Sequence, residues 1–479
     1  MDPTFLPAWC LAELVRSGTL GCLELLDHCI ARVERLDARL NAVVVRDFER
    51  ARGRARRLDQ AGRGAGPLFG VPMTVKESFD LAGSPSTWGY ENRKEHRAET
   101  DALAVRRLEA AGAVVFGKTN VPVGLADWQS YNPVYGSTSN PWHPGHTPGG
   151  SSGGGAAACA AGLSALELGS DIGGSIRVPA HYCGLFGLKP SWGLCSPRGQ
   201  SMFNAAALTD IAVIGPMARS ARDLALVLDV ILGPDPIEAV YGYTLPEPRV
   251  RTLSECRVAV WAEEPGQATD AETVALIEGL ARHLEREGAE VSRTARPEFD
   301  PAEAFRLYVT LLDAALSART PEENLARRRE EKTRLAADDV STDALFVRAV
   351  DLGHREWLKL NERRHQIRRA WGSFFKRWDV LLCPVIATPA LPHMQEGETW
   401  ERSLEVNGKR ISYNDMLFWP GITCGFHLPA SVAPIGLSRA GLPIGVQIAG
   451  PVGGDRMTIK VAEMLELSFR SFVAPPGWE

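Results

Sequence analysis

The chain has 479 residues, of which 45% are hydrophobic and 23% are charged, and its formal net charge at pH 7 is -5. This is the composition of an ordinary folded protein, and so small a charge gives no reason to expect a nucleic-acid partner. The arginine-rich runs at 327–329 and 363–364 lie among glutamates, which favours solvated helix faces. No apolar run approaches the roughly 18 residues of a membrane helix, so we expect no membrane partner.

Nine cysteines are dispersed along the chain without paired spacing. An odd, scattered set in a chain of this length predicts free thiols in a reducing compartment. The N-terminal residues also lack the basic flank and apolar run of a secretory signal. We therefore expect a cytoplasmic protein.

Helices and strands alternate in the first part of the chain. Apolar residues at helical spacing predict helices in the first sixty residues, with Thr19 as the N-cap of the second helix. A short apolar run at 67–75 ends at Lys76 and predicts a strand. A helical pattern follows at 101–112, closed by Gly112, and then a strand-like segment at 113–116. This alternation is typical of an α/β protein.

The middle of the chain contains two segments rich in glycine and serine. Residues 132–155 predict a loop, residues 156–168 a buried helix, and residues 169–175 a second loop. Beyond them we expect helices at 218–232 (capped by Ser220), at 269–288 and through most of 300–378, and strands at 256–261, at 379–384 and twice within 421–451. The sequence contains no internal repeat and no linker, so we expect residues 1–479 to form a single domain. Within it, we expect 235–345 to be a variable, mainly helical insertion.

The two glycine-rich segments suggest chemistry, because glycines let backbone N–H groups converge on one point. Such a cluster binds either a phosphate or the oxyanion of an acyl-transfer intermediate. No lysine and serine or threonine follow Gly155, as a phosphate-binding loop requires. Ser175 ends the second segment, so a nucleophile and its oxyanion hole could come from one stretch of chain. The natural oxyanion donors are the N–H groups at the end of that segment, from Ile172, Gly173, Gly174 and Ser175.

A serine nucleophile needs a base, and a lysine can serve if burial lowers its pKa toward neutrality. Lys76 follows an apolar segment, which is consistent with such burial. A second serine could then bridge the base and the nucleophile.

These motifs resemble the amidase signature family. The resemblance is carried by Gly149–Pro190, the segments GVPMTVKE at 70–77 and GKTN at 117–120, NPW at 140–142, GLPIGVQ at 441–447 and VAEMLE at 461–466. It covers roughly residues 8–466 and is weakest at 235–345. It implies one large α/β domain, with a twisted, mostly mixed sheet surrounded by helices.

The resemblance also implies a Ser–Ser–Lys triad. Ser175 corresponds to the nucleophile, Ser151 to the bridging serine that follows a cis peptide bond, and Lys76 to the general base. Supporting roles fall to Ser152 and to the pair Asp171 and Arg177. The implied reaction passes through an acyl-enzyme and requires no metal or organic cofactor.

This sequence departs from the family pattern after the Lys-Thr-Asn block, where many members have an acidic-aromatic pair. The segment at 121–129 stands there instead, and it leaves the substrate open. We expect substrate-pocket residues there and further along the chain, namely Trp128, Gln129, Tyr131, Met202, Phe203 and Trp419.

Other interpretations of the same residues are weaker. Gly149–Gly153 also fits a G-x-S-x-G elbow with Ser151 as nucleophile and His393 or His427 as base, but the residues before it make a poor strand. The pair His143 and His146 lacks an evident third metal ligand. The cysteines at 159, 183 and 195 fit the small, buried apolar role that free cysteines usually have. Lys76 taken alone would more often be an exposed lysine at the end of a strand, and only the two serine-containing segments favour a catalytic role.

The function expected is that of an amidohydrolase with a small-molecule amide substrate. Small or aryl amides come first, with esters or carbamates as further substrates. One alternative is a glutamine-hydrolysing subunit of a transamidating complex, because such a subunit shares the triad. Another is a non-catalytic binding scaffold. The sequence leaves the oligomeric state open, and a homodimer is compatible with it.

Overall fold

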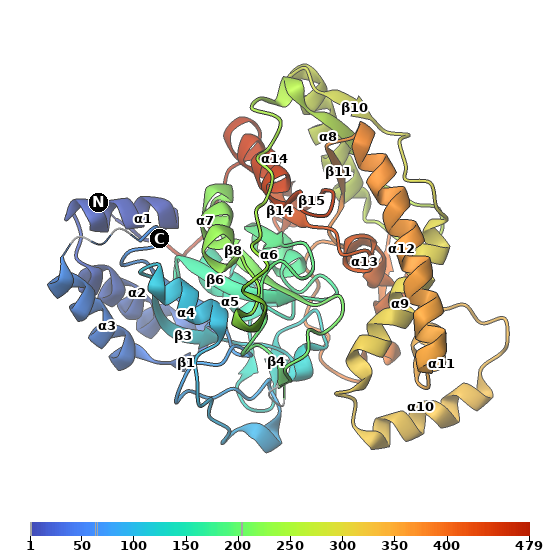
Figure 1. Cartoon of the computed structure of the whole chain (residues 1–479), viewed down its shortest axis with the longest axis horizontal. Coiled ribbons are helices and arrows are strands. Elements are labelled where there is room, and N and C mark those ends of the chain that lie inside the picture. The colour runs from blue at the N-terminus through green and yellow to red at the C-terminus, as the bar shows by residue number, and fades with distance from the viewer. Residues whose placement is uncertain (1, 63, 65, 203–204) are drawn as a thin grey trace.

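A large mixed sheet forms the centre of the protein (Figure 1). The computed structural model describes residues 2–62, 64, 66–202 and 205–479, in which eleven strands join in this sheet. The strands are β1 (Val43–Arg46), β2 (Pro72–Lys76), β3 (Val114–Thr119), β6 (Leu166–Asp171), β7 (Phe186–Lys189), β8 (Val213–Ala218), β9 (Arg257–Val260), β10 (Glu290–Ser292), β11 (Val380–Pro384), β14 (Ala430–Leu437) and β15 (Pro443–Ala449). Their order across the sheet is β1-β3-β2-β6-β8-β7-β14-β15-β11-β9-β10.

The strand directions make the sheet mixed. Strand β2 runs parallel to both β3 and β6, whereas β6 runs antiparallel to β8. Every residue of β2, β3 and β6 is buried, as expected of parallel strands covered on both faces. Two pairs of short strands lie outside this sheet, β4 (Tyr131–Asn132) with β5 (Gly136–Ser137) and β12 (Ser403–Val406) with β13 (Lys409–Ser412).

Helices surround the sheet, so the predicted α/β domain is confirmed (Figure 1). The helices are α1 (Ala8–Ser17), α2 (Cys22–Leu36), α3 (Phe48–Ala61), α4 (Leu103–Ala110), α5 (Gly153–Ala160), α6 (Arg177–Cys183), α7 (Ala221–Ile231), α8 (Ala271–Arg286), α9 (Pro301–Ser317), α10 (Glu322–Arg334), α11 (Thr342–Ala349), α12 (His354–Arg377), α13 (Phe418–Cys424) and α14 (Asp455–Ser468). None of those formed by described residues is both long and apolar enough to cross a membrane.

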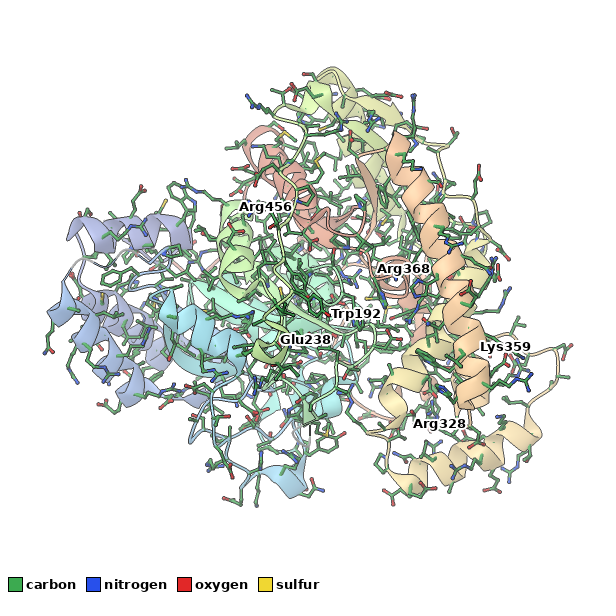
Figure 2. The ribbon with its side chains drawn as sticks, in the orientation of Figure 1. Trp192, Glu238, Arg328, Lys359, Arg368 and Arg456 are labelled. Atoms are coloured by element: carbon green, nitrogen blue, oxygen red, sulfur yellow. The ribbon has the colours of Figure 1, made fainter. Side chains whose placement is uncertain are left out.

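Helix α10 differs from the other helices of this region because it has no buried residue. It lies at the edge of the molecule, reached by loops on both sides (Figure 1). Arg328, labelled in Figure 2, connects it to α9 through an ion pair of 2.7 Å with Asp313. This helix is therefore held to the rest of the protein largely by polar contacts.

Several predicted elements are confirmed, and two boundaries are wrong. The strand ending at Lys76, the strand near 113–116 and the helix near 269–288 are present as β2, β3 and α8. The predicted helix at 156–168 is wrong in its bounds, because α5 begins inside the glycine run at Gly153 and ends at Ala160. Strand β6 then occupies Leu166–Asp171, where the end of the helix and the start of a loop were expected. Alanine and leucine fit either structure when they are buried, and the sheet neighbours decide the outcome.

The N-cap predicted for the second helix is also wrong. Helix α2 begins at Cys22 after Gly21, and the N–H groups of Cys22 and Leu23 donate to the Asp59 carboxylate at 2.7 and 3.0 Å. A side chain from helix α3 therefore satisfies donors that we expected Thr19 to satisfy. No local pattern indicates a cap supplied by a distant residue.

The range 235–345 contains helices α8 to α10, but it also supplies β9 and β10 to one edge of the main sheet. Residues from its C-terminal half, on α9 and α10, line the cavity at Ser175 that is described below.

The predicted cap of α7 is confirmed and can be tested. The Ser220 hydroxyl accepts a hydrogen bond of 3.2 Å from the N–H of Arg222. We expect Ser220→Ala to lower the free energy of unfolding by about 1 kcal/mol, the usual cost of losing such a cap. Chemical denaturation measures the change. Ser254→Ala, at an exposed position, is the control and should change stability by less than about 0.5 kcal/mol; equal losses in both variants would contradict the capping role.

Candidate active site

Lys76 lies at the end of strand β2 with no exposed side-chain surface. Its Nζ donates to the Ser151 hydroxyl at 2.7 Å and to the Ser170 hydroxyl at 3.1 Å. The structure therefore brings two of the expected residues, Lys76 and Ser151, into direct contact. Ser170 was missed from the sequence because the loop predicted at 169–175 included it, whereas in strand β6 it lies beside the end of β2.

Burial lowers the pKa of Lys76 to about 7, although the negative charges of Asp171 and Glu167 act in the opposite direction. No described carboxylate forms an ion pair with this amine. A buried ammonium group without a counterion is costly, so a large fraction of the Lys76 amine is neutral near pH 7.

Two other buried lysines show what is particular about Lys76. Burial also lowers the pKa of Lys118, to about 8, and that of Lys189. Lys118 donates to the Pro85 carbonyl and, at 2.9 Å, to the Ser86 hydroxyl, whereas Lys189 donates to the carbonyls of Leu428 and Pro190 at 2.7 and 3.1 Å. A carbonyl only accepts hydrogen bonds, whereas both partners of Lys76 are hydroxyl groups that can also give up a proton.

The loop before α5 presents Ser151 to the lysine. The peptide bond between Gly150 and Ser151 is cis, as the resemblance implies. A Cβ atom on Gly150 would come within 2.3 Å of the Asp127 carbonyl oxygen, so only glycine fits the close approach of these two chain segments. The N–H of Ser152 donates to the carbonyl of Ser175 at 3.1 Å, which ties this loop to the next one.

The loop that carries Ser175 is held by a buried ion pair. Arg177 donates to both oxygens of the Asp171 carboxylate, at 2.9 and 3.0 Å, and neither side chain is exposed. The same carboxylate accepts hydrogen bonds from the N–H groups of Gly174 and Ile176 at 2.9 and 3.1 Å. Burial would raise the pKa of Asp171, but the Arg177 charge outweighs it and the pKa is lowered. The carboxylate therefore stays ionised and fixes the loop.

These contacts change the set of expected oxyanion donors. The N–H of Gly174 is engaged by Asp171 and is not free for a substrate. Gly174 has a φ of 101°, which favours glycine, so its part in the loop is conformational. The N–H groups of Ile172, Gly173 and Ser175 have no acceptor among the described residues.

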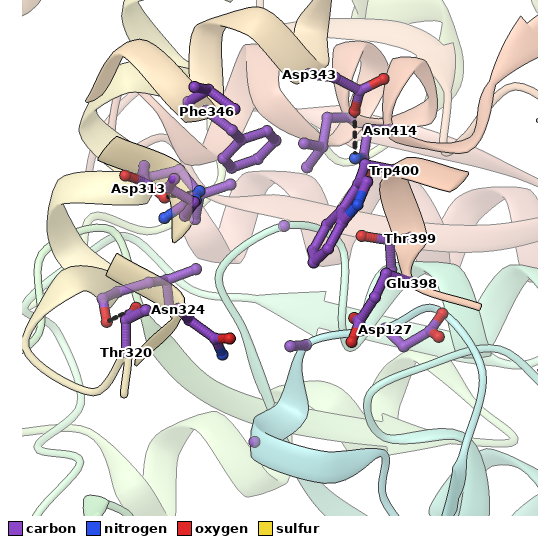
Figure 3. Close-up of a pocket in the computed structure, with 18 of the residues that line it drawn as sticks. Asp127, Asp313, Thr320, Asn324, Asp343, Phe346, Glu398, Thr399, Trp400 and Asn414 are labelled. Atoms are coloured by element: carbon purple, nitrogen blue, oxygen red, sulfur yellow. Dashed lines mark hydrogen bonds and ion pairs between the residues drawn. The ribbon is translucent and has the colours of Figure 1, made fainter. Parts of the chain in front are cut away.

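A cavity of about 650 Å³ opens at Ser175, which is 6% exposed (Figure 3). The expected oxyanion residues Ile172 and Gly173 and the expected pocket residues Trp128 and Met202 are among the residues that line it. The Trp128 indole donates to the Gly173 carbonyl at 2.9 Å, so this pocket residue also supports the Ser175 loop. Figure 3 shows further walls, with Asp313, Thr320 and Asn324 on one side and Asp343, Thr399 and Trp400 on the other.

Three residues that we expected in the pocket do not line this cavity. The Gln129 amide is buried and forms two hydrogen bonds with the backbone of Met394. The Tyr131 hydroxyl bonds to Arg402 and Asp127. The Trp419 indole is buried and donates to Thr269. In each case a polar group that could have faced a ligand is engaged within the protein. Phe203 lies outside the described residues.

The alternative interpretations find less support. No described histidine is hydrogen-bonded to Ser151, and the His427 ring is bound to Asp210 at 3.0 Å. Among the described elements, no strand directly precedes Gly149, as an elbow of the G-x-S-x-G type requires. His143 and His146 contact each other at 2.8 Å, and the described residues contain no cluster of three side chains suited to hold a metal ion.

Comparison with known proteins shows which family the chain resembles. The Amidase family model matches residues 24–459. The 6-aminohexanoate-cyclic-dimer hydrolase of Paenarthrobacter ureafaciens is 34% identical over 95% of this chain and 93% of its own length. One subunit of the glutamyl-tRNA(Gln) amidotransferase of Synechococcus sp. (strain CC9605) is 32% identical over 98% of this chain and 97% of its own. A solved structure of 6-aminohexanoate cyclic dimer hydrolase complexed with substrate superposes with a TM-score of 0.80 and 30% identity, covering 100% of both chains.

The fold and these relatives define a hydrolase that acts on amide C–N bonds. The chain belongs to the amidase signature family.

The buried ion pair under the Ser175 loop gives a stability prediction. Asp171→Asn leaves the Arg177 guanidinium buried without its counterion, so we expect the free energy of unfolding to fall by about 3–5 kcal/mol. Chemical denaturation measures the loss. Glu278→Gln, which removes one exposed partner of Arg293, is the control and should cost no more than about 1 kcal/mol. A loss in Asp171→Asn as small as in the control would show that the pair is not needed.

Proposed function

We propose that this protein hydrolyses small or aryl carboxamides through Ser175, Ser151 and Lys76, with esters or carbamates as further substrates. The observation that carries the proposal is the 2.7 Å contact between a buried lysine amine and the Ser151 hydroxyl. An amine with a pKa of about 7 accepts a proton near neutral pH, and a hydroxyl in contact with it can relay one.

The reaction has two halves. The Ser175 Oγ forms a bond to the amide carbonyl carbon while its proton passes to Ser151 and the Ser151 proton passes to the Lys76 Nζ. The C–N bond then breaks, the proton returns by the same path to the leaving nitrogen, and an amine departs. Water repeats the sequence on the Ser175 ester, which releases the carboxylic acid and restores the serine.

The negative charge on the carbonyl oxygen needs donors in both halves. We assign this role to the N–H groups of Ile172 and Gly173, with that of Ser175, because they line or adjoin the cavity and have no described acceptor. Losing one such donor in other enzymes costs on the order of 10²–10³ in rate. Gly174 does not donate to the oxyanion in this proposal, because its own N–H binds Asp171; it affects the other donors only through the loop conformation.

Ser170 and Gln200 are positioning residues in this proposal. The Gln200 amide donates to the hydroxyls of Ser78 and Ser170, each at 3.2 Å. Ser170 in turn holds the Lys76 amine opposite Ser151. This arrangement directs the amine and limits its rotation.

The variable region shapes the substrate pocket. Helices α9 and α10 lie within 235–345 and contribute one wall of the cavity, which includes Leu312, Asp313 and Asn324. The segment after them adds Phe346 and Val347. These walls contain both apolar and charged groups, which supports an organic amide of moderate size as the substrate.

A second function is favoured by one relative. The amidotransferase protein from Synechococcus covers almost the whole chain at 32% identity, which supports a glutamine-hydrolysing subunit of a transamidating complex as the alternative. The purified chain distinguishes the two. Hydrolysis of a chromogenic anilide without a partner or ATP supports the stand-alone amidase, and turnover only inside a complex supports the alternative.

We also propose a cytoplasmic location. All nine cysteines lie in the described part of the chain, all are free, and eight are buried. Free thiols of this kind suit a reducing compartment. A homodimer stays a prediction.

The nucleophile assignment is tested by Ser175→Ala. We expect kcat/KM for a chromogenic anilide to fall by at least about 10⁴-fold, because the proposal places no other hydroxyl at the carbonyl carbon. Ser317→Ala is the matched control and should keep full activity, since that hydroxyl bonds within helix α9. Activity of Ser175→Ala within tenfold of wild type would sink the proposal.

The base assignment predicts a pH profile. Lys76 is neutral only above its lowered pKa of about 7, so kcat/KM should reach a plateau above that pH and fall about tenfold per unit below it. Lys76→Arg keeps a proton at every accessible pH and should be inactive throughout. A wild-type profile that keeps rising to pH 10 would mean that the amine is not held neutral.

A further inference from the structure

Arginines line the cavity at several positions, and one of them has neither an ion-pair nor a hydrogen-bond partner among the described residues. The four described arginines of the lining are Arg319, Arg327, Arg328 and Arg334. Arg327 pairs with Glu331 at 2.6 Å, Arg328 with Asp313 at 2.7 Å, and Arg334 with Glu330. Among described residues, no carboxylate lies within ion-pair distance of Arg319, and no acceptor receives its guanidinium N–H groups.

Arg319 is placed in the cavity wall rather than in open solvent. It follows helix α9 and is half-buried, with its guanidinium carbon 5.7 Å from the ring centre of Trp88. The Trp88 side chain is buried, so it gives the guanidinium a rigid apolar support. Burial removes part of the water around the Arg319 guanidinium and thereby lowers its pKa. An arginine remains protonated under these conditions.

Tyr90 provides a second polar group at this place. It lines the same cavity, its ring is half-buried, and its hydroxyl has no partner among the described residues. The backbone beside it is close, because a Cβ atom on Gly124 would come within 2.6 Å of the Tyr90 oxygen. Tyr90 is two residues from Trp88, over whose ring the Arg319 guanidinium lies, and both Arg319 and Tyr90 line this cavity. The charge of Arg319 lowers the phenol pKa of Tyr90, against the larger effect of burial.

None of the carboxylates in the described lining of the cavity pairs with Arg319; they belong to Asp127, Asp313, Glu331, Asp339, Asp343 and Glu398. Asp127 is bound to Arg402, and Asp313 is bound to Arg328. Asp343 accepts hydrogen bonds from Ser412 and Asn414. In Figure 3, Asp343 and Asn414 lie across the cavity from Thr320, the residue next to Arg319. The corner formed by Arg319 and Tyr90 therefore presents donors for which the described residues supply no acceptor.

We propose that Arg319 and Tyr90 form an anion subsite, so that the preferred amide substrates of this enzyme carry a carboxylate remote from the bond that is cleaved. The inference rests on the proposed function and names its substrate class. A guanidinium group binds a carboxylate through two parallel hydrogen bonds, and a phenol hydroxyl adds a third. The partly desolvated setting strengthens such a contact relative to one in water. Either the acyl part or the amine part of the substrate can supply the carboxylate.

Binding to the inactive Ser175→Ala protein tests the subsite without requiring turnover. One arm compares the mono-4-nitroanilide of glutaric acid with the 4-nitroanilide of pentanoic acid, which places the carboxylate on the acyl side. The other arm compares 4-acetamidobenzoate with 4-acetamidobenzamide, which places it on the amine side. Calorimetry measures the dissociation constant of each ligand. We expect the carboxylated ligand of one arm to bind about 10- to 100-fold more tightly than its neutral partner.

Matched variants assign that preference to the subsite. Added to Ser175→Ala, Arg319→Gln should abolish the preference and Arg319→Lys should keep part of it. Tyr90→Phe should reduce it by about 3- to 10-fold. Arg306→Gln is the control, because Arg306 lies on the same helix α9 and pairs with Asp300 outside the cavity. It should leave both dissociation constants unchanged.

Two results would overturn the proposal. The first is equal or undetectable binding of the charged and neutral ligands in both arms. The second is a preference for carboxylates that survives in Arg319→Gln. Neither result touches the proposed function, which fails separately if the wild-type protein does not hydrolyse the neutral anilide through Ser175.

Discussion

The burial of the Lys76 amine, away from any described carboxylate that could pair with it, is the constraint on which the rest of the site depends. A lysine at the end of a strand would normally reach water and stay charged. Here β2 lies between β3 and β6, and all three strands are covered. The large sheet thus does more than form a core, because it excludes water from an amine and lowers its pKa. Lys118 and Lys189 are buried as well, but each donates to at least one backbone carbonyl. Of these three lysines, only Lys76 has hydroxyl groups as both of its partners.

The two glycine-rich loops meet the sheet at this point and have different tasks. The first brings Ser151 against the lysine, and close chain packing at Gly150 requires a residue without a side chain. The second loop holds Ser175 at the cavity. The Asp171–Arg177 pair fixes the conformation of this loop, because Asp171 also accepts a hydrogen bond from the N–H of Gly174. Because Asp171 also binds the N–H of Gly174, the ion pair determines which backbone groups remain free toward a substrate. Loop conformation, ion pairing and the proposed oxyanion site are therefore one connected feature.

Much of this arrangement could be predicted from the sequence, and the failures have physical causes. The contact of Lys76 with Ser151 and the pairing of Asp171 with Arg177 follow from motifs that resemble a known family. Ser170 was missed because alanine, leucine and glycine left the boundary between α5 and β6 undefined. Gln129 and Tyr131 were placed in the pocket by their position at the segment that departs from the family pattern, and Trp419 was placed there as an apolar residue. Their polar groups are satisfied by Met394, Arg402 and Thr269, which lie far away in the sequence. Such long-range partners leave no local pattern.

The charge state of the Lys76 amine is the quantity that tests this account most directly. It can be measured by NMR on protein labelled with ¹³C at the lysine Cε atoms, with the Lys76 signal assigned by its loss in Lys76→Arg. Titration of that signal should give a midpoint near pH 7. A midpoint near the ordinary lysine value of about 10.4 would mean that the amine is a permanent cation at neutral pH. The buried lysine could then not accept a proton from Ser151, and the proposed mechanism would be wrong.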